Sequence, residues 1–68
     1  MRDNKLLNAL RIRFEANKAE GEATLEVYLN NAVGIGEHPQ MLDEMAKQID
    51  KIAAADDALL VIRRIDND

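Results

Sequence analysis

An apolar stripe runs through the second half of the chain and constrains its fold more than any other feature. Its members are Met41, Met45, Ile49, Ile52, Ala55, Leu59, Ile62 and Ile65. Spacings of three or four residues place these side chains on one face of a helix. Pro39 suits the first helical position, because its missing N–H would have no partner there. The spacing predicts a helix over about residues 39–65.

The first half of the chain allows two interpretations. Residues 10–16 and 24–29 alternate apolar and polar side chains as strands do, which would give an α+β, ββαβ fold with residues 58–65 as a third strand. The same half also places apolar residues at helical spacing, separated by good helix formers. A helix over about residues 4–32 would match the second helix in length. We therefore expect an all-α fold, an antiparallel two-helix hairpin.

The middle of the first predicted helix is weak. Asn17 and Gly21 fall where the apolar face requires large side chains, and glycine costs about 1 kcal/mol relative to alanine inside a helix. A residue without a side chain would let a neighbouring backbone approach closely. A local break in the helix would explain these two residues equally well, and both interpretations stay open.

The chain is short for a fold that stabilises itself. It has 68 residues and no cysteine, so it lacks disulfides and thiolate metal sites, and we treat residues 1–68 as a single domain. Two helices hide only one side of each other. The apolar side chains left without cover are Leu6, Val27, Leu29, Leu60 and Val61. We therefore expect a homo-oligomer, either a dimeric four-helix bundle or a higher oligomer.

The segment between the predicted helices concentrates special residues. Gly34 can adopt the left-handed conformation that ends a helix, and Ile35 can then fold back onto Leu29. Gly36, Glu37 and His38 lead on to the second helix. The whole segment, about residues 33–38, is therefore explained as the end of the first helix, a turn and the approach to the second helix.

A binding site is the alternative interpretation of this segment. Glycines beside a helix amino terminus expose backbone N–H groups that can hold an anion. The residues that would bind a ligand or partner here are Asn30, Asn31, Gly34, Ile35, Gly36, Glu37, His38 and Gln40. The spacing matches neither the dinucleotide fingerprint nor the P-loop, and Glu37 would repel phosphate.

Composition narrows the classes of function. A net charge of −4 argues against nucleic-acid binding, because that binding relies on clustered Lys and Arg. One histidine, with no serine or cysteine, excludes the familiar nucleophile triads, so we expect no enzyme, no catalytic residues, no metal and no cofactor. No apolar run is long enough to span a membrane and no signal peptide begins the chain. We expect a cytoplasmic protein.

The turn VGIGEHPQ, residues 33–40, and its flanking arms carry one resemblance. Over about residues 12–57 the chain resembles short proteins of unassigned function encoded by T-even-like tailed phages of marine cyanobacteria. In those proteins an arm rich in alanine and glutamate leads into a similar turn and a second acidic arm. The resemblance implies a viral accessory protein that acts by binding inside an infected cell, in the host cytoplasm.

Three functions are consistent with these features. The first, which we favour, is an accessory protein that binds a host or phage protein through the surface of a helical hairpin. The second is an oligomeric protein that sequesters a small anionic nucleotide signal of host defence at the turn. The third is a structural or assembly component of a virion.

Overall fold

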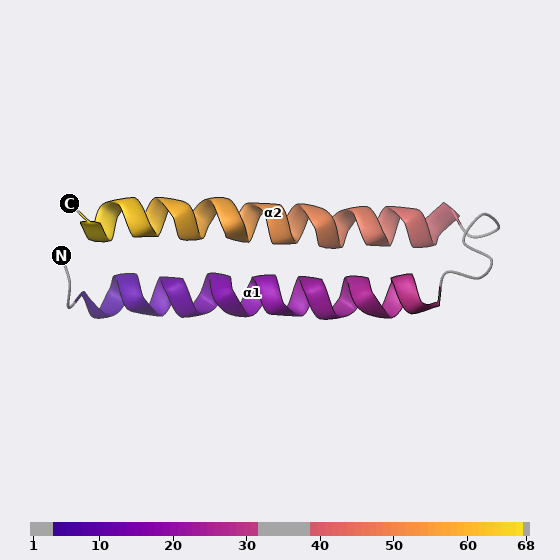
Figure 1. Cartoon of the computed structure of the whole chain (residues 1–68), viewed down its shortest axis with the longest axis horizontal. Coiled ribbons are helices and arrows are strands. Elements are labelled where there is room, and N and C mark those ends of the chain that lie inside the picture. Colours follow the sequence, from indigo (N-terminus) through magenta and orange to yellow (C-terminus); the bar gives the residue numbers. More distant parts are fainter. Residues whose placement is uncertain (1–3, 32–38, 68) are drawn as a thin grey trace.

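Two long helices make up the described part of the chain. In this computed structural model the description covers residues 4–31 and 39–67. Helix α1 spans Lys5–Asn30 and helix α2 spans Pro39–Asn67. They lie side by side and run in opposite directions, so the start of α1 lies near the end of α2 (Figure 1). The predicted all-α helical hairpin is confirmed, and residues 4–31 and 39–67 contain no strand.

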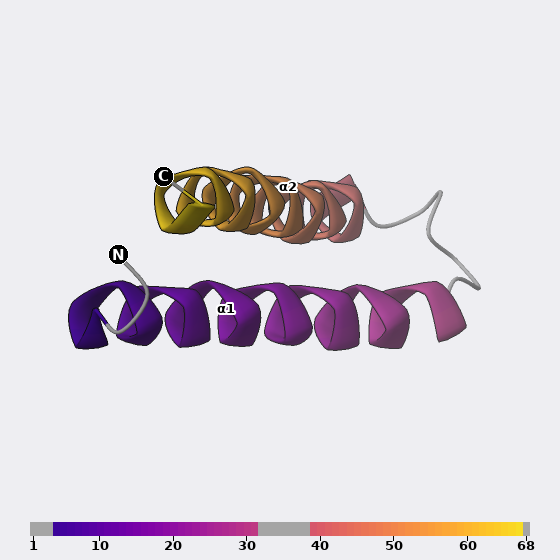
Figure 2. The same ribbon diagram turned by 60° about the vertical axis from the view of Figure 1, so that its left-hand side comes forward.

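The pair is long and thin. Its principal extents are 50 × 14 × 13 Å, as expected for helices of this length packed in a single layer. Turned by 60°, α2 is seen more nearly end-on than α1, so the two axes are inclined to one another (Figure 2). Each helix therefore meets the other along one stripe and leaves most of its circumference uncovered.

Two asparagines set the ends of α1. The side-chain oxygen of Asn4 accepts a hydrogen bond from the backbone N–H of Leu7 at 2.9 Å, which satisfies one of the free donors of the first turn. At the other end, the backbone N–H of Asn31 donates to the carbonyl of Tyr28 at 3.1 Å, and its side-chain amide donates to the carbonyl of Val27 at 2.7 Å. Both ends are closed by local polar contacts.

The segments with strand-like alternation are helical. Residues 10–16 and 24–29 lie within α1, and residues 58–65 lie within α2. Alternation in short apolar runs does not separate strand from helix, and here the helical spacing of the larger apolar side chains determines the result. Helix α2 begins at Pro39, as its suitability for the first helical position predicted, and continues to Asn67.

A regular seam joins the two helices. On α2 the seam consists of buried and half-buried residues at alternating spacings of four and three: Met41, Met45, Gln48, Ile52, Ala55, Leu59, Ile62 and Asp66. Those of α1 that follow the same alternation are Leu7, Arg11, Phe14, Lys18, Gly21, Leu25 and Tyr28. A repeat that averages 3.5 residues keeps both stripes in contact along their length, as in coiled coils.

This seam corrects the predicted stripe of α2 at two positions. Ile49 is 53% exposed and Ile65 is 39% exposed, while Gln48 and Asp66 take the inward positions. The prediction included every apolar residue on one broad face of α2. Helix α1 crosses α2 at a shallow angle and contacts a narrower set of residues, which recur every 3.5 residues on average. Full burial is rare along it: Ala55 at 1% and Ile62 at 5% are the buried hydrophobic residues of the described chain.

The two helices approach each other closely at Gly21. It is buried, and α1 continues through it without a break. A β-carbon added there would lie 2.9 Å from Cγ1 of Ile52 and 3.4 Å from the backbone oxygen of Gln48. Of the two interpretations of this glycine, close approach is therefore correct. Ile52 fills the space that any side chain at position 21 would need.

Replacing Gly21 by alanine should test this contact. Alanine improves helix propensity by about 1 kcal/mol, but the added β-carbon forces Ile52 to shift, and such overpacking typically costs about 1–3 kcal/mol. We expect Gly21→Ala to lower the free energy of unfolding by about 1 kcal/mol, measured by urea denaturation at a fixed protein concentration.

Ala23→Gly is the matched control, because Ala23 is exposed on the same helix. Its free energy of unfolding should be lower by about 1 kcal/mol, the intrinsic cost of glycine in a helix. If Gly21→Ala instead raises the free energy of unfolding by as much as Ala23→Gly lowers it, position 21 has room for a side chain and the close approach is refuted.

Candidate interaction surface

The structure describes three of the residues predicted to form a site at the turn. Asn30, Asn31 and Gln40 are exposed, while Gly34, Ile35, Gly36, Glu37 and His38 lie outside the described residues. The side chain of Asn31 donates to the carbonyl of Val27, so its amide caps α1. That role was readable from an asparagine at the end of a helical pattern, although the sequence interpretation assigned it to ligand contact. Ligand binding at the turn stays a prediction.

The apolar side chains expected to lack cover do lack it. Leu6, Val27, Leu29, Leu60 and Val61 are between 45% and 79% exposed. Ile12 and Leu42, which the sequence interpretation did not single out, are also more than half exposed. Such side chains come from both helices and from their whole length. The hairpin surface is therefore a candidate for contact with another polypeptide.

Two ion pairs between the helices divide this surface into two sides. Lys18 Nζ lies 2.7 Å from Asp56 Oδ1, and Lys51 pairs with Glu20. Residues two apart, such as Lys18 and Glu20, point about 200° apart around a helix. The two pairs therefore flank the seam on opposite sides, which we name the Lys18 side and the Lys51 side.

On the Lys18 side, one row of α2 is apolar near the turn and charged near the termini. On α2, the row of residues seven apart that contains Asp56 is Leu42, Ile49, Asp56 and Arg63. On α1, Leu29 is three helical turns from Lys18 and so shares its side. The row of Leu29 continues at seven-residue spacing through Glu22 and Glu15, so apolar and charged residues are mixed on the α1 part of this side.

The Lys51 side has the opposite distribution on its α2 row. Lys51, Ala58 and Ile65 follow each other at seven-residue spacing, with the apolar members toward the carboxyl end. The α1 row on this side is Leu6, Arg13, Glu20 and Val27, with charges in its middle. Leu6 and Ile65 thus lie near the termini, and the charged residues lie between them and the turn.

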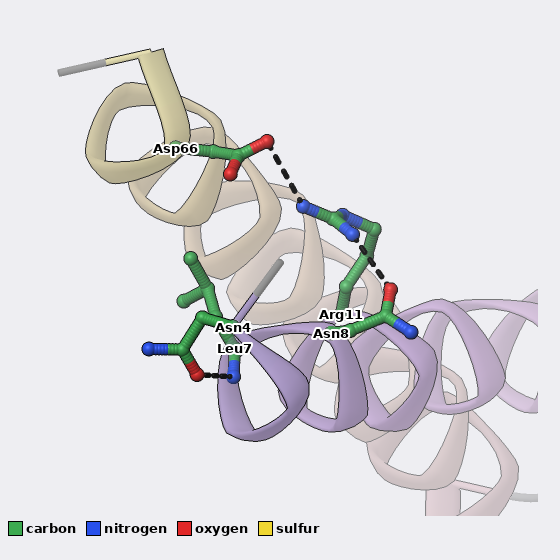
Figure 3. A network of polar contacts seen from close by, with 5 residues as sticks. All are labelled: Asn4, Leu7, Asn8, Arg11 and Asp66. Atoms are coloured by element: carbon green, nitrogen blue, oxygen red, sulfur yellow. Dashed lines mark hydrogen bonds and ion pairs between the residues drawn. The ribbon is translucent and has the colours of Figure 1, made fainter. Parts of the chain in front are cut away.

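A shallow hollow opens at the termini on the Lys18 side. Its volume is about 400 Å³ and it is lined by Arg11, Glu15, Leu59, Arg63 and Asp66. The Arg11 guanidinium donates to Oδ1 of Asn8 at 2.8 Å and to Oδ2 of Asp66 at 3.5 Å, so it links the first turns of α1 to the last turn of α2 (Figure 3). Two cations balance two carboxylates here, and the hollow favours neither an anion nor a cation.

The ion pairs shift the pKa of Glu20 and the pKa of Lys18. The hydrogen bond from Lys51, and then the charge of its ammonium group, lower the pKa of Glu20. The hydrogen bond to Asp56, and then the charge of that carboxylate, raise the pKa of Lys18. All four groups lie at or near the surface, where solvent weakens such pairs. They align the two helices more than they stabilise them.

The described residues show neither a metal-binding cluster nor a membrane-spanning helix. Within residues 4–31 and 39–67, no group of three or more His, Cys, Asp or Glu side chains is arranged to hold a metal ion. Neither described helix has a stretch long and apolar enough to cross a bilayer.

Comparisons with known proteins add no assignment. The chain matches no protein-family model. No similarity to curated proteins and none to solved structures was found. The resemblance to short cyanophage proteins stays a prediction.

Acid should weaken the pair between Glu20 and Lys51. The pKa of Glu20 is lower in the folded chain, so its stabilising contribution is present above the ordinary value of 4.5 and is lost as the pH falls through the folded value. The contribution of Lys18, whose pKa is raised, is present below 10.5 and is lost in alkali. We expect a thermal midpoint that is level near neutral pH and falls below about pH 4.5.

Glu20→Gln isolates this pair from the other carboxylates. The variant should have a slightly lower thermal midpoint at neutral pH. Its midpoint should fall less on acidification than that of the unmodified chain, because position 20 no longer titrates. Parallel midpoint curves for the variant and the unmodified chain would show that the pair contributes nothing measurable.

Proposed function

We propose that this protein acts by binding other polypeptides through its apolar helix surfaces, first a further copy of itself and then a protein of the host or phage. The observation that carries the proposal is the exposure of large hydrophobic side chains outside the seam, which reaches 79% at Leu6. Soluble monomers rarely leave extended apolar patches uncovered, and such patches mark contact surfaces.

The accessible surface supports self-association. The hairpin exposes 5219 Å², whereas a compact monomer of 7.6 kDa exposes about 4,300 Å². The excess, about 900 Å², is close to the ~800 Å² that each partner buries in a standard interface. A dimer that forms a four-helix bundle would therefore bring the hairpin to the surface expected for its mass.

A second apolar stripe supports binding of a different protein. It lies on the outer face of α1, opposite the seam: Ala9, Ile12, Ala16, Ala19, Ala23 and Val27. Its spacing of three and four residues repeats that of a helix contact, and its alanines allow another helix to come close. Following the resemblance, we assign this partner to the infected cell, as a host or phage protein in the cytoplasm.

Native mass tests self-association. We expect sedimentation equilibrium to give a multiple of 7.6 kDa, with helicity and association lost together on dilution. Ile52→Asp, which puts a charge into the seam, should unfold and dissociate the protein in one step. A folded monomer at all concentrations would refute self-association.

Capture from infected-cell lysate tests the second binding step. The unmodified protein should recover one partner in stoichiometric amount, and Ile12→Lys on the outer face of α1 should lose it while keeping its native mass. Asp50→Lys, an exposed change on α2 away from that face, is the control and should keep the partner. Recovery of assembled particles alone would favour a structural role in the virion.

A further inference from the structure

Each helix carries a second stripe beside the seam, on the Lys51 side. This stripe consists of the residue that directly precedes each seam residue, so it lies about 100° around the helix from the seam. Helices of a four-helix bundle contact two neighbours in about this relation. Glu20 and Lys51, which pair across the seam, belong to the two stripes. The members on α1 are Leu6, Leu10, Arg13, Asn17, Glu20, Thr24 and Val27, and those on α2 are Gln40, Glu44, Lys47, Lys51, Ala54, Ala58, Val61 and Ile65.

Apolar and charged residues are separated along both of these stripes. The terminal half of the side holds four large apolar side chains that are 39–79% exposed: Leu6, Leu10, Val61 and Ile65. Arg13 is the one charged stripe member among the described residues of that half. The other half, toward the turn, holds the remaining charges of the stripes: Glu20, Glu44, Lys47 and Lys51. The Lys51 side is therefore apolar at the termini and charged toward the turn, on α1 as well as on α2.

We propose that a second copy of the chain docks on the Lys51 side, with both turns at the same end. Helix α1 of each copy then lies against α2 of the other, and the apolar ends of the two copies meet. This assignment rests on the self-association proposed above and adds the face and the direction of docking. The Lys18 side, and Ile12 on the outer face of α1, stay free for a different partner.

Symmetry leaves two ways to place the Lys51 side against itself over its full length. A two-fold axis along the hairpin keeps the turns together. A two-fold axis across the hairpin reverses one copy, so that each helix faces its own counterpart. Ile65 would then lie against Glu44 of the partner subunit, and Val61 against the partner's Lys47. Burying charges against apolar side chains is costly, so the arrangement with the turns together is favoured.

Apolar side chains face each other at the termini in the favoured arrangement. Glu20 and Lys51 pair within one hairpin and so lie at the same height. Residues equally far from these two toward the termini are also at equal height, which makes Leu6 level with Ile65 and Leu10 level with Val61. Leu6 therefore faces Ile65 of the partner subunit. Leu10 faces Val61 of the partner subunit.

Opposite charges face each other toward the turn. Glu20 is level with Lys51 of the partner subunit, just as it is with Lys51 of its own hairpin. The two copies together thus bring two carboxylates and two ammonium groups to one height. Such complementarity steers association and fixes its direction.

Arg13 and Val27 depart from the separation, and both fit the favoured arrangement. Arg13 is level with Ala58 of the partner subunit, and its hydrocarbon stem can lie over that small residue while the guanidinium reaches solvent. Val27 is level with Glu44 of the partner subunit. Within each hairpin that carboxylate accepts a hydrogen bond from Lys47 at 2.9 Å. The hydrocarbon stem of the partner's Lys47 can therefore cover Val27.

The Lys18 side fits itself less well. Glu22 and Glu26 lie on it toward the turn, between apolar residues of both helices. Docking this side with the turns together would set those carboxylates against Ala46 and Ile49 of the partner subunit. The Lys51 side avoids this cost, because its carboxylates face lysines or remain paired with them.

The surface that a dimer needs to cover favours contact along the whole side. The hairpin exposes about 900 Å² more than a compact monomer of its mass, and a standard interface buries ~800 Å² of each partner. Overlap of the terminal ends alone would cover only half of each stripe. Docking with the turns together covers both stripes of both copies.

Paired lysine substitutions test the face. Val61→Lys should weaken dimerisation at least about tenfold, because it places an ammonium group among the apolar side chains of the interface. Ile49→Lys makes the same change at a similarly exposed β-branched residue of α2, on the Lys18 side. It should change the dimer dissociation constant, measured by sedimentation equilibrium, by less than about twofold. Equal weakening by the two variants, or a dimer unaffected by Val61→Lys, would overturn the assignment.

A second pair of leucine variants guards against an effect on folding alone. Leu6 and Leu42 are exposed leucines near the starts of α1 and α2. Leu6→Lys should weaken the dimer at least about tenfold and Leu42→Lys by less than about twofold. Circular dichroism at high protein concentration should show the same helicity for both variants. Weakening by Leu42→Lys and not by Leu6→Lys would place the contact on the Lys18 side.

Distances between spin labels test the direction. The chain has no cysteine, so Asp43→Cys and Arg64→Cys each introduce one label site, near the turn and near the carboxyl end of α2. Mixed dimers carry a label at residue 43 of one copy and a distinct label at residue 64 of the other. With the turns together, roughly 20 residues of helix separate these labels, which gives about 40 Å or more. A reversed full-length dimer brings them to one height, about 15 Å apart.

Dimers labelled at residue 43 of both copies distinguish the remaining arrangement. With the turns together, the two labels should be about 30 Å apart, across the width of the bundle. Overlap of the terminal ends alone would move the turns apart and lengthen this distance to about 60 Å.

The outcomes separate the docking assignment from self-association. A monomer in sedimentation would overturn both together. A dimer that resists Val61→Lys, or one with a short mixed distance or a long distance between the labels at residue 43, would overturn the face or the direction and leave self-association intact.

Discussion

The contact between Gly21 and Ile52 determines how closely the two helices can lie. A side chain at position 21 would force Ile52 to shift, because its β-carbon would lie 2.9 Å from Cγ1 of Ile52. The seam on either side of this point follows the same alternation of four and three residues, so contact between the helices continues toward both ends. The charged side chains beside the seam reach across it because the backbones are this close. A glycine that weakens the helix locally thus strengthens the pairing of the helices.

Much of this architecture was predictable, and the exceptions have physical causes. Periodicity and Pro39 predicted two helices in a hairpin, and counting the apolar residues off the stripe predicted the exposure of Leu6 and Val61. Periodicity alone did not predict that Gln48 and Asp66 face inward, because the partner helix selects which part of a broad apolar face is used. It also left Gly21 undecided, since close approach depends on a residue of the other helix, Ile52.

The candidate interaction surface, like the fold, was predictable only in part from the sequence. A single helix pattern can show that hydrophobic side chains are left over, but their grouping on two sides depends on which residues pair across the seam. The pairs of Lys18 with Asp56 and Lys51 with Glu20 supply that information.

The position of Gly21 also specifies the axial register of the two helices. A seam built on a seven-residue repeat looks nearly the same after a slip of seven residues, so a second alignment would compete with the first. Such a slip would place Ile52 opposite Phe14 or Tyr28, the residues seven before and seven after Gly21. Neither leaves room for an isoleucine at this separation. One missing side chain therefore selects a single alignment out of several that the repeat would otherwise permit.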